Sequence, residues 1–304
     1  MAQARHPVLP PMADSLSISW SPLRAFRRRR SPIDALHRES ERAARVVCVA
    51  SGKGGTGKSV VATNLACARA RAGERVCLID FDAGLANDHL LLGLAPRHDL
   101  GHVMRGEVSA RTALVTGPHS LNLLSGGVGR HVLTQPTRRE LDKLFKHLAP
   151  LESSHDLIVV DLGAGLGYIT VAHLAATTTL LLVTNPEVTA LSDAYALFKR
   201  ARGVNPDLRA GLVVNRCRSE EAASNAWERF RSASSRFLGA APELVGWVPA
   251  DDNIPQSVDD RLPVLLGNPQ CPAASSLAQV AKWGPLEHAR STRPFFERAR
   301  RALR

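Results

Sequence analysis

Short apolar, β-rich runs alternate with longer helix-like stretches through most of this chain. The runs are Val46–Ala50, Val76–Ile79, Leu121–Leu124, Leu157–Val160, Leu180–Val183, Gly211–Val214 and Leu244–Val248. The helix-like stretches lie near 58–72, 137–148, 167–176, 189–202, 219–238 and 273–284. The runs are continuously apolar, as expected for strands whose sheet is covered by helices on both faces. The pattern predicts an α/β fold, with one doubly wound, mostly parallel sheet and helices on both faces.

The charge distribution distinguishes the segment that contains these runs from two basic ends of the chain. The chain has 304 residues and a net charge of +11, but residues 46–281 hold 23 basic and 22 acidic side chains. Residues 1–45 are rich in Pro and Ser and hold nine arginines against four acidic residues. We expect 1–45 to be a basic, largely disordered arm with a short helical pattern towards its end. The expected folded body then spans 46–284, and 285–304 form a linker and a basic C-terminal helix.

Other features exclude several classes of protein. No stretch approaches 18 consecutive apolar residues, so no membrane-spanning helix is expected. The N-terminus lacks the apolar core of a secretory signal. The five cysteines include no C-x-x-C pair, which favours reduced, buried thiols over a disulfide framework or a zinc site. These features are typical of a cytoplasmic protein.

The first apolar run leads directly into a phosphate-binding motif. Gly52, Lys53, Gly54, Gly55, Thr56, Gly57, Lys58 and Ser59 match G-x-x-x-x-G-K-[ST] in full. A strand before this loop and a helix after it direct backbone N–H groups at a bound phosphate. Lys58 is then expected to contact the β- and γ-phosphates, and the Ser59 hydroxyl to bind Mg²⁺. The loop alone does not distinguish ATP from GTP.

Carboxylates follow two other strands. Asp80 directly follows the run Val76–Ile79, Asp82 comes two residues later, and Asp161 directly follows Leu157–Val160. The carboxyl ends of parallel strands gather at one edge of the sheet, so these side chains are expected beside the phosphate loop. There they can hold the hydration shell of Mg²⁺ or orient an attacking water. For any single Asp, a helix N-cap is the alternative.

The second lysine in the loop makes the chain recognisable. Lys53 gives K-G-G-x-G-K-[ST], the deviant Walker A motif typical of the MinD/ParA class of P-loop ATPases. Further segments resemble the flagellar-number regulators of the FlhG group (FleN, YlxH), and MinD next: 79–87, 125–129, 184–197 and 213–216. The resemblance covers about 46–266.

The resemblance implies a role for each matching residue. Lys53 would reach across an ATP-bound homodimer to the partner's phosphates, so that Lys53, Lys58 and Asp82 form the catalytic set. Asp82 would position the hydrolytic water in a slow, switch-type ATPase, with Asp80, Asp161 and Ser59 around Mg²⁺. Asn215, Pro249 and Asp251 would surround the adenine. The chain lacks the N/T-K-x-D signature by which GTP-binding proteins recognise guanine. It also lacks the cysteine pair of Mrp-type iron–sulfur carriers.

The C-terminal segment has the pattern of a short amphipathic helix. After Pro294, the apolar residues Phe295, Phe296 and Leu303 fall on one helical face and arginines fall on the other. This is the sequence form of an interfacial anchor, and both MinD and FlhG carry such a tail. We therefore expect these three residues to contact an anionic membrane surface. The alternative is a helix docked on the protein's own body.

Together these features predict an ATP-dependent, dimerising and membrane-associating spatial regulator, with flagellar number or placement as the first choice. It would be cytoplasmic and peripheral on the inner face of the cell membrane in its ATP state. An FlhF-like GTPase or flagellar basal-body proteins are candidate partners, although 34–38 match the GTPase-stimulating element of FlhG proteins poorly. A division-site MinD is the alternative, and a ParA-type partition ATPase is the second. The near-neutral body argues against nucleic acid as a partner.

Overall fold

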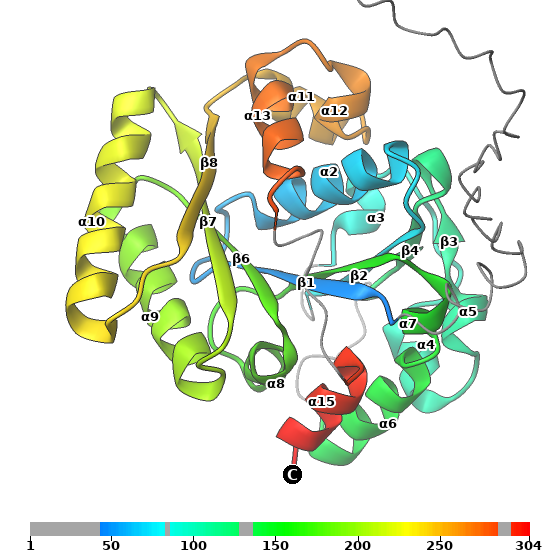
Figure 1. Ribbon diagram of the computed structural model, residues 1–304. Coiled ribbons are helices and arrows are strands. Elements are labelled where there is room, and N and C mark those ends of the chain that lie inside the picture. The colour runs from blue at the N-terminus through cyan, green and yellow to red at the C-terminus, as the bar shows by residue number, and fades with distance from the viewer. Residues whose placement is uncertain (1–42, 83–85, 128–135, 285–292) are drawn as a thin grey trace, which may run out of the picture. The chain divides into compact units, whose positions relative to one another are not determined.

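One eight-stranded sheet organises the computed structural model, which describes residues 43–82, 86–127, 136–284 and 293–304 (Figure 1). The strands are β1 (Arg45–Ala50), β2 (Val76–Phe81), β3 (Val115–Thr116), β4 (Asn122–Leu124), β5 (Leu157–Leu162), β6 (Thr179–Thr184), β7 (Arg209–Cys217) and β8 (Glu243–Pro249). Their order is β3-β4-β2-β5-β1-β6-β7-β8, and every neighbouring pair is parallel except β3 and β4. The predicted doubly wound, mostly parallel sheet is confirmed.

Helices cover both faces of this sheet and enclose two apolar cores (Figure 1). One face carries α4 (Leu100–Arg105), α5 (Ala110–Ala113), α6 (Arg138–Leu148), α7 (Leu151–Ser154), α8 (Tyr168–Ala176), α9 (Val188–Val204), α10 (Glu220–Leu238) and α15 (Phe295–Ala302). The other carries α2 (Lys58–Arg71), α11 (Asn253–Asp259), α12 (Val264–Gly267) and α13 (Pro272–Val280). Alternate residues of β1 enter opposite cores, as the strand period requires: Val46 and Cys48 enter one, Val47 and Val49 the other.

Sequence patterning missed only short elements of the described chain. These are β3, the one-turn helix α3 (Asp88–Leu91), the 3₁₀ turn η1 (Pro118–Ser120) and helices α4, α5, α7, α11 and α12. A two-residue strand or a one-turn helix is too short to show a hydrophobic period. The five cysteines are all buried free thiols, as predicted. The expected arm lies outside the described residues up to position 42, and no described helix has the length and apolarity needed to cross a bilayer.

The C-terminal helix α15 departs from the membrane-anchor prediction. Phe295, Phe296 and Leu303 are 1%, 0% and 5% exposed, and α15 packs against α6 and α8. The ring of Phe296 lies 6.0 Å from that of Phe145, between centroids. The predicted membrane contact of these three residues is therefore wrong for this conformation. An amphipathic pattern requires only that one face be covered, and the protein's own core covers it.

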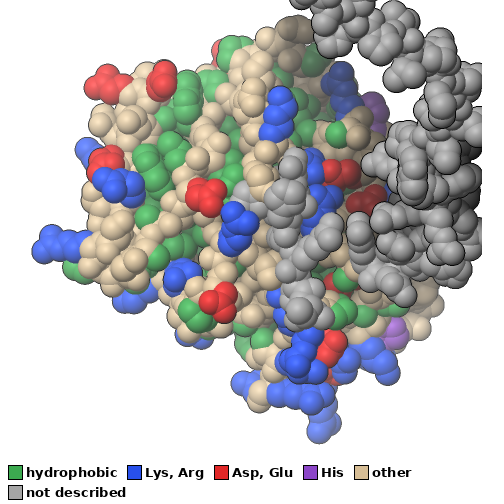
Figure 2. All heavy atoms as spheres, viewed as in Figure 1, with side chains coloured by type: hydrophobic (Ala, Val, Ile, Leu, Met, Phe, Trp, Pro, Cys, Tyr) green, Lys and Arg blue, Asp and Glu red, His purple; other side chains and the backbone are tan. Residues whose placement is uncertain are grey.

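A buried carboxylate fixes the start of α15. Glu152 is 3% exposed, and its two carboxylate oxygens accept hydrogen bonds from the backbone N–H groups of Phe295 (2.7 Å) and Phe296 (2.9 Å). These N–H groups lie in the first turn, where a helix has no internal acceptors for them. The opposite side of α15 is basic, and Figure 2 shows Lys and Arg side chains gathered at this end of the molecule. Among them, Arg300 pairs with Asp142 at 2.9 Å.

Candidate functional site

The phosphate loop joins β1 to α2, and two of its glycines have no room for a side chain. A Cβ on Gly52 would lie 2.1 Å from the backbone carbonyl carbon of Asp193, in α9. Gly57 has a φ of +87° and faces the Asn215 side chain, which a Cβ there would approach to 2.2 Å. The Asn215 amide donates a hydrogen bond to the Thr56 carbonyl at 2.7 Å. The sequence motif thus folds as a tightly supported loop before a helix N-terminus, as phosphate binding requires.

The two lysines of the loop have opposite environments. The side chain of Lys58 is 6% exposed, and its Nζ lies 2.7 Å from Asp161 Oδ1 and 3.7 Å from Asp82 Oδ2. The side chain of Lys53 is 44% exposed, and its Nζ lies 3.4 Å from Glu187 Oε2 at the start of α9. Lys58 is therefore held inside the site, whereas Lys53 is at the surface of the same loop.

The predicted carboxylates meet at the loop. Asp80 and Asp161 are register partners on the neighbouring strands β2 and β5. Asp161 Oδ2 accepts a hydrogen bond from the Ser59 hydroxyl at 2.6 Å, and Asp80 Oδ1 accepts one from the backbone N–H of Asp82 at 2.9 Å. Asp82 is the more exposed of these acids, at 26% of its side chain. The expectation that the strand ends bring these groups beside Lys58 is confirmed, whereas their catalytic and metal-binding roles stay predictions.

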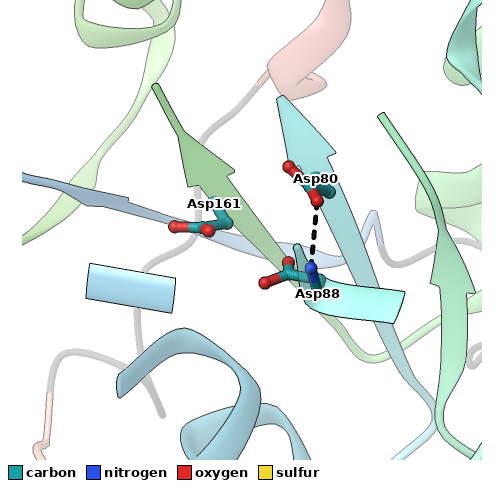
Figure 3. Close-up of side chains that lie close together, drawn as sticks. All are labelled: Asp80, Asp88 and Asp161. Carbon is teal, nitrogen blue, oxygen red and sulfur yellow. Dashed lines mark hydrogen bonds between the residues drawn. The ribbon is translucent and has the colours of Figure 1, made fainter. Parts of the chain in front are cut away.

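Sequence reasoning missed a fourth acid, Asp88. It begins α3 and is fully buried, and a carboxylate oxygen from each of Asp80, Asp88 and Asp161 lies within 4.8 Å of the other two (Figure 3). The backbone N–H of Asp88 donates to Asp80 Oδ2 at 3.2 Å, but neither oxygen of its own carboxylate has a hydrogen-bond partner within the described parts of the chain. The available signal was a further acid eight residues after Asp80, just before the leucines at 90–92.

Burial dominates the electrostatics of this cluster. Burial, and then repulsion from Asp161, raise the pKa of Asp80 to about 7. Burial followed by repulsion from Asp161 and Asp80 raises the pKa of Asp88 well above its usual range. Burial also raises the pKa of Asp161, although Lys58 opposes that shift. Burial lowers the pKa of Lys58, but its contacts with Asp161 outweigh this effect and raise the pKa above its ordinary value. Among the described residues, the site therefore gathers the carboxyl groups of Asp80, Asp82, Asp88 and Asp161 around one buried lysine.

The residues present suit a Mg²⁺–nucleotide ligand. Hydroxyl and carboxylate oxygens are the hard donors that Mg²⁺ prefers, and Ser59, Asp80 and Asp161 supply them at one edge of the sheet. The glycine positions leave backbone N–H groups accessible to phosphate oxygens. Ser59 and the strand-end carboxylates would hold the ion, and the loop would hold the phosphates.

The predicted adenine residues are less clearly arranged for that role. Asn215 supports the phosphate loop through Thr56, as described above. The carboxylate of Asp251 is already occupied: it accepts from the backbone and side chain of Asn253 (2.9 and 2.7 Å) and from the backbone N–H of Ala273 (3.1 Å). Pro249 ends β8. The assignment of Asn215, Pro249 and Asp251 to the adenine stays a prediction.

Comparisons with known proteins agree with this geometry. Residues 47–264 match the model of the CobQ/CobB/MinD/ParA nucleotide binding domain. The antiactivator FleN of Pseudomonas aeruginosa is 32% identical over 237 residues, which cover 78% of this chain and 85% of FleN. The flagellum site-determining protein YlxH of Helicobacter pylori is 29% identical over 236 residues, covering 77% and 80%. The Mg-ADP complex of septum site-determining MinD from Pyrococcus horikoshii superposes with a TM-score of 0.66 at 26% identity, covering 79% and 95%.

Proposed function

Because this chain belongs to the CobQ/CobB/MinD/ParA nucleotide-binding family, we propose that it is an ATP-dependent switch. It binds Mg²⁺·ATP in the phosphate loop, dimerises around the nucleotide and hydrolyses ATP slowly to return to a monomer. Mg²⁺ neutralises phosphate charge when it is bound. Lys58 binds the β- and γ-phosphates, and Asp82, which is near Lys58 and open to solvent, orients the attacking water.

The contrast between the two loop lysines carries this proposal. Lys58 is buried beside Asp161, so it serves the nucleotide of its own chain. Lys53 is 44% exposed, and its contacts with the exposed Glu187 and with Thr189 are both 3.4 Å long, so moving it away from the body costs little. A second copy of the chain would present its phosphates to this exposed cation. An exposed lysine in the phosphate loop is placed to act on a partner's nucleotide.

We further propose that the switch regulates flagellar number or placement. The relatives FleN and YlxH, described as an antiactivator and a flagellum site-determining protein, support this assignment. An FlhF-like GTPase or a basal-body protein is the candidate partner. The membrane contact of α15 forms no part of the proposed function, because its apolar face is buried in the body.

Nucleotide titration tests the chemistry. The purified protein is expected to bind Mg²⁺·ATP more tightly than Mg²⁺·GTP in calorimetry. Lys58→Ala should weaken ATP binding by at least about 100-fold, since it removes the buried charge that meets the phosphates. Asp82→Ala should retain binding and lose turnover. Equal affinity for GTP, or normal turnover by Asp82→Ala, would contradict these roles.

Complementation tests the biological role. A Pseudomonas aeruginosa strain lacking FleN is the natural host, since FleN is 32% identical to this chain. The wild-type protein should restore flagellar number, and Lys58→Ala at equal abundance should not. Rescue of a strain lacking MinD, with no effect on flagella, would instead assign the chain to division-site placement.

A further inference from the structure

The acidic cluster beside the phosphate loop contains one carboxylate that nucleotide binding does not explain. Ser59, Asp80 and Asp161 account for the ion that accompanies ATP. Asp88 is 0% exposed, and its side chain points towards Asp80 and Asp161 from the start of α3 (Figure 3). Neither of its carboxylate oxygens has a hydrogen-bond donor among the described residues. Buried carboxylates are ordinarily paired with a cation or with donors, so this group lacks a partner that the fold itself could supply.

The spacing of the three acids suits a single cation. One oxygen from each of Asp80, Asp88 and Asp161 lies within 4.8 Å of the others. Two oxygens on opposite sides of a divalent ion are about 4.2 to 4.8 Å apart, and adjacent ones are closer. The three oxygens therefore lie close enough for one ion to draw them into its coordination shell through small side-chain movements. Oxygen donors alone select hard cations such as Mg²⁺, Mn²⁺ or Ca²⁺ over Zn²⁺ or Cu²⁺.

The charge balance also favours a cation. The charged groups that act on Asp88 are three acids, Asp161, Asp80 and Asp82, and one base, Lys58. Lys58 is already shared between Asp161 and the Ser59 hydroxyl, and it makes no contact with Asp88. No hydrogen bond or ion pair joins the Asp88 carboxylate to a base among the described residues, so a divalent ion between the carboxylates would supply the missing positive charge.

We propose that Asp80, Asp88 and Asp161 form a divalent-cation site that fills without nucleotide, with Asp88 as a direct ligand. The site is formed by β2, α3 and β5, which are held together by the β2–β5 ladder and the bond from Asp88 N–H to Asp80. It therefore exists before ATP arrives. An ion bound there would order the chain between β2 and α3 next to the phosphate loop.

Titration of nucleotide-free protein with Mn²⁺ alone, followed by the loss of the free Mn²⁺ resonance in electron paramagnetic resonance, tests this site. The wild type should bind one Mn²⁺ per chain, and excess Mg²⁺ should displace it. Asp88→Asn keeps the shape of the side chain and removes the charged ligand, so its affinity should fall by at least tenfold. Asp156→Asn is the matched control, because Asp156 precedes β5 at the end of the strand opposite Asp161 and pairs with Arg75; it should bind within twofold of the wild type.

A second readout and a second variant keep the proposal falsifiable. Mn²⁺ should raise the midpoint of thermal unfolding of the nucleotide-free wild type, and should leave that of Asp88→Asn unchanged. Asp88→Ala gives the same comparison with a smaller side chain. A wild type that binds no Mn²⁺ without nucleotide, or variants that bind it as the wild type does, would overturn the proposal. ATP is absent from both assays, so their failure leaves the proposed switch intact, and failure of ATP binding leaves this site intact.

Discussion

Two buried carboxylates in this molecule have opposite surroundings. Glu152 is 3% exposed and accepts two backbone N–H bonds at the start of α15. Asp88 is 0% exposed and its carboxylate accepts no hydrogen bond from the described residues. Both oxygens of Glu152 are used by the protein's own backbone, so this acid has a structural role. The oxygens of Asp88 have no such donors beside the phosphate loop, so burial alone does not explain this acid.

The largest expected effect concerns the apolar contacts of α15. Phe296→Ala removes a fully buried ring that packs against Phe145, and should lower the free energy of unfolding by about 3–5 kcal/mol. Phe237→Ala is the matched control: this ring is 66% exposed on α10, and its loss should change stability by less than about 0.5 kcal/mol. Denaturant unfolding measures both. Equal stabilities would mean that α15 is not part of the core.

The next effect is a loss of stability at acidic pH, caused by His173, which lies next to α15. His173 is fully buried, its ring lies 5.9 Å from that of Phe295, and burial lowers its pKa to about 4. Between about pH 6.5 and 4 the unfolded chain therefore binds a proton that the folded protein does not. The His173 contribution to stability should fall by about 3 kcal/mol as the pH falls through that range.

A difference measurement isolates this histidine. The raised pKa of Asp80, about 7, has the opposite effect, since it favours the folded state as the pH falls. His173→Phe keeps a ring in the cluster and removes the titrating group. The unfolding free energy of the wild type minus that of His173→Phe should fall by about 3 kcal/mol as the pH drops from 7 to 4. A constant difference across that range would contradict a neutral, buried His173.

The smallest expected effect is the difference in stability between substitutions of the two buried carboxylates, Glu152 and Asp88. Glu152→Gln places an amide where two N–H groups need acceptors, so it should destabilise the protein by about 1–3 kcal/mol. Asp88→Asn removes a buried ionisable group and, among the described residues, no hydrogen bond to the side chain. In metal-free buffer it should be neutral or stabilising by about 1 kcal/mol. A loss of stability in Asp88→Asn equal to that in Glu152→Gln would remove the distinction between the two sites.

The same contrast explains what the sequence could reveal. The apolar runs predicted seven of the described strands, and the loop motif placed Lys58 and Ser59 correctly, because both signals are local in the chain. The amphipathic pattern of α15 showed that one face is covered, but its cap, Glu152, lies 143 residues before Phe295. Asp88 is eight residues from Asp80, yet only the packing of α3 on the strand ends reveals that its carboxylate has no partner. Contacts between residues that are far apart in the chain produce no periodic pattern in the sequence. The absence of a contact produces none either.

The central claim is that nucleotide controls association through Lys53. Sedimentation of the hydrolysis-deficient Asp82→Ala protein measures it most directly, in Mg²⁺·ATP and in Mg²⁺·ADP. A dimer is expected with ATP and a monomer with ADP. Adding Lys53→Ala should give a monomer with either nucleotide, because the exposed cation that meets the partner's phosphates is gone. A mass that does not change with nucleotide, or a Lys53→Ala dimer as stable as the parent, would contradict the switch.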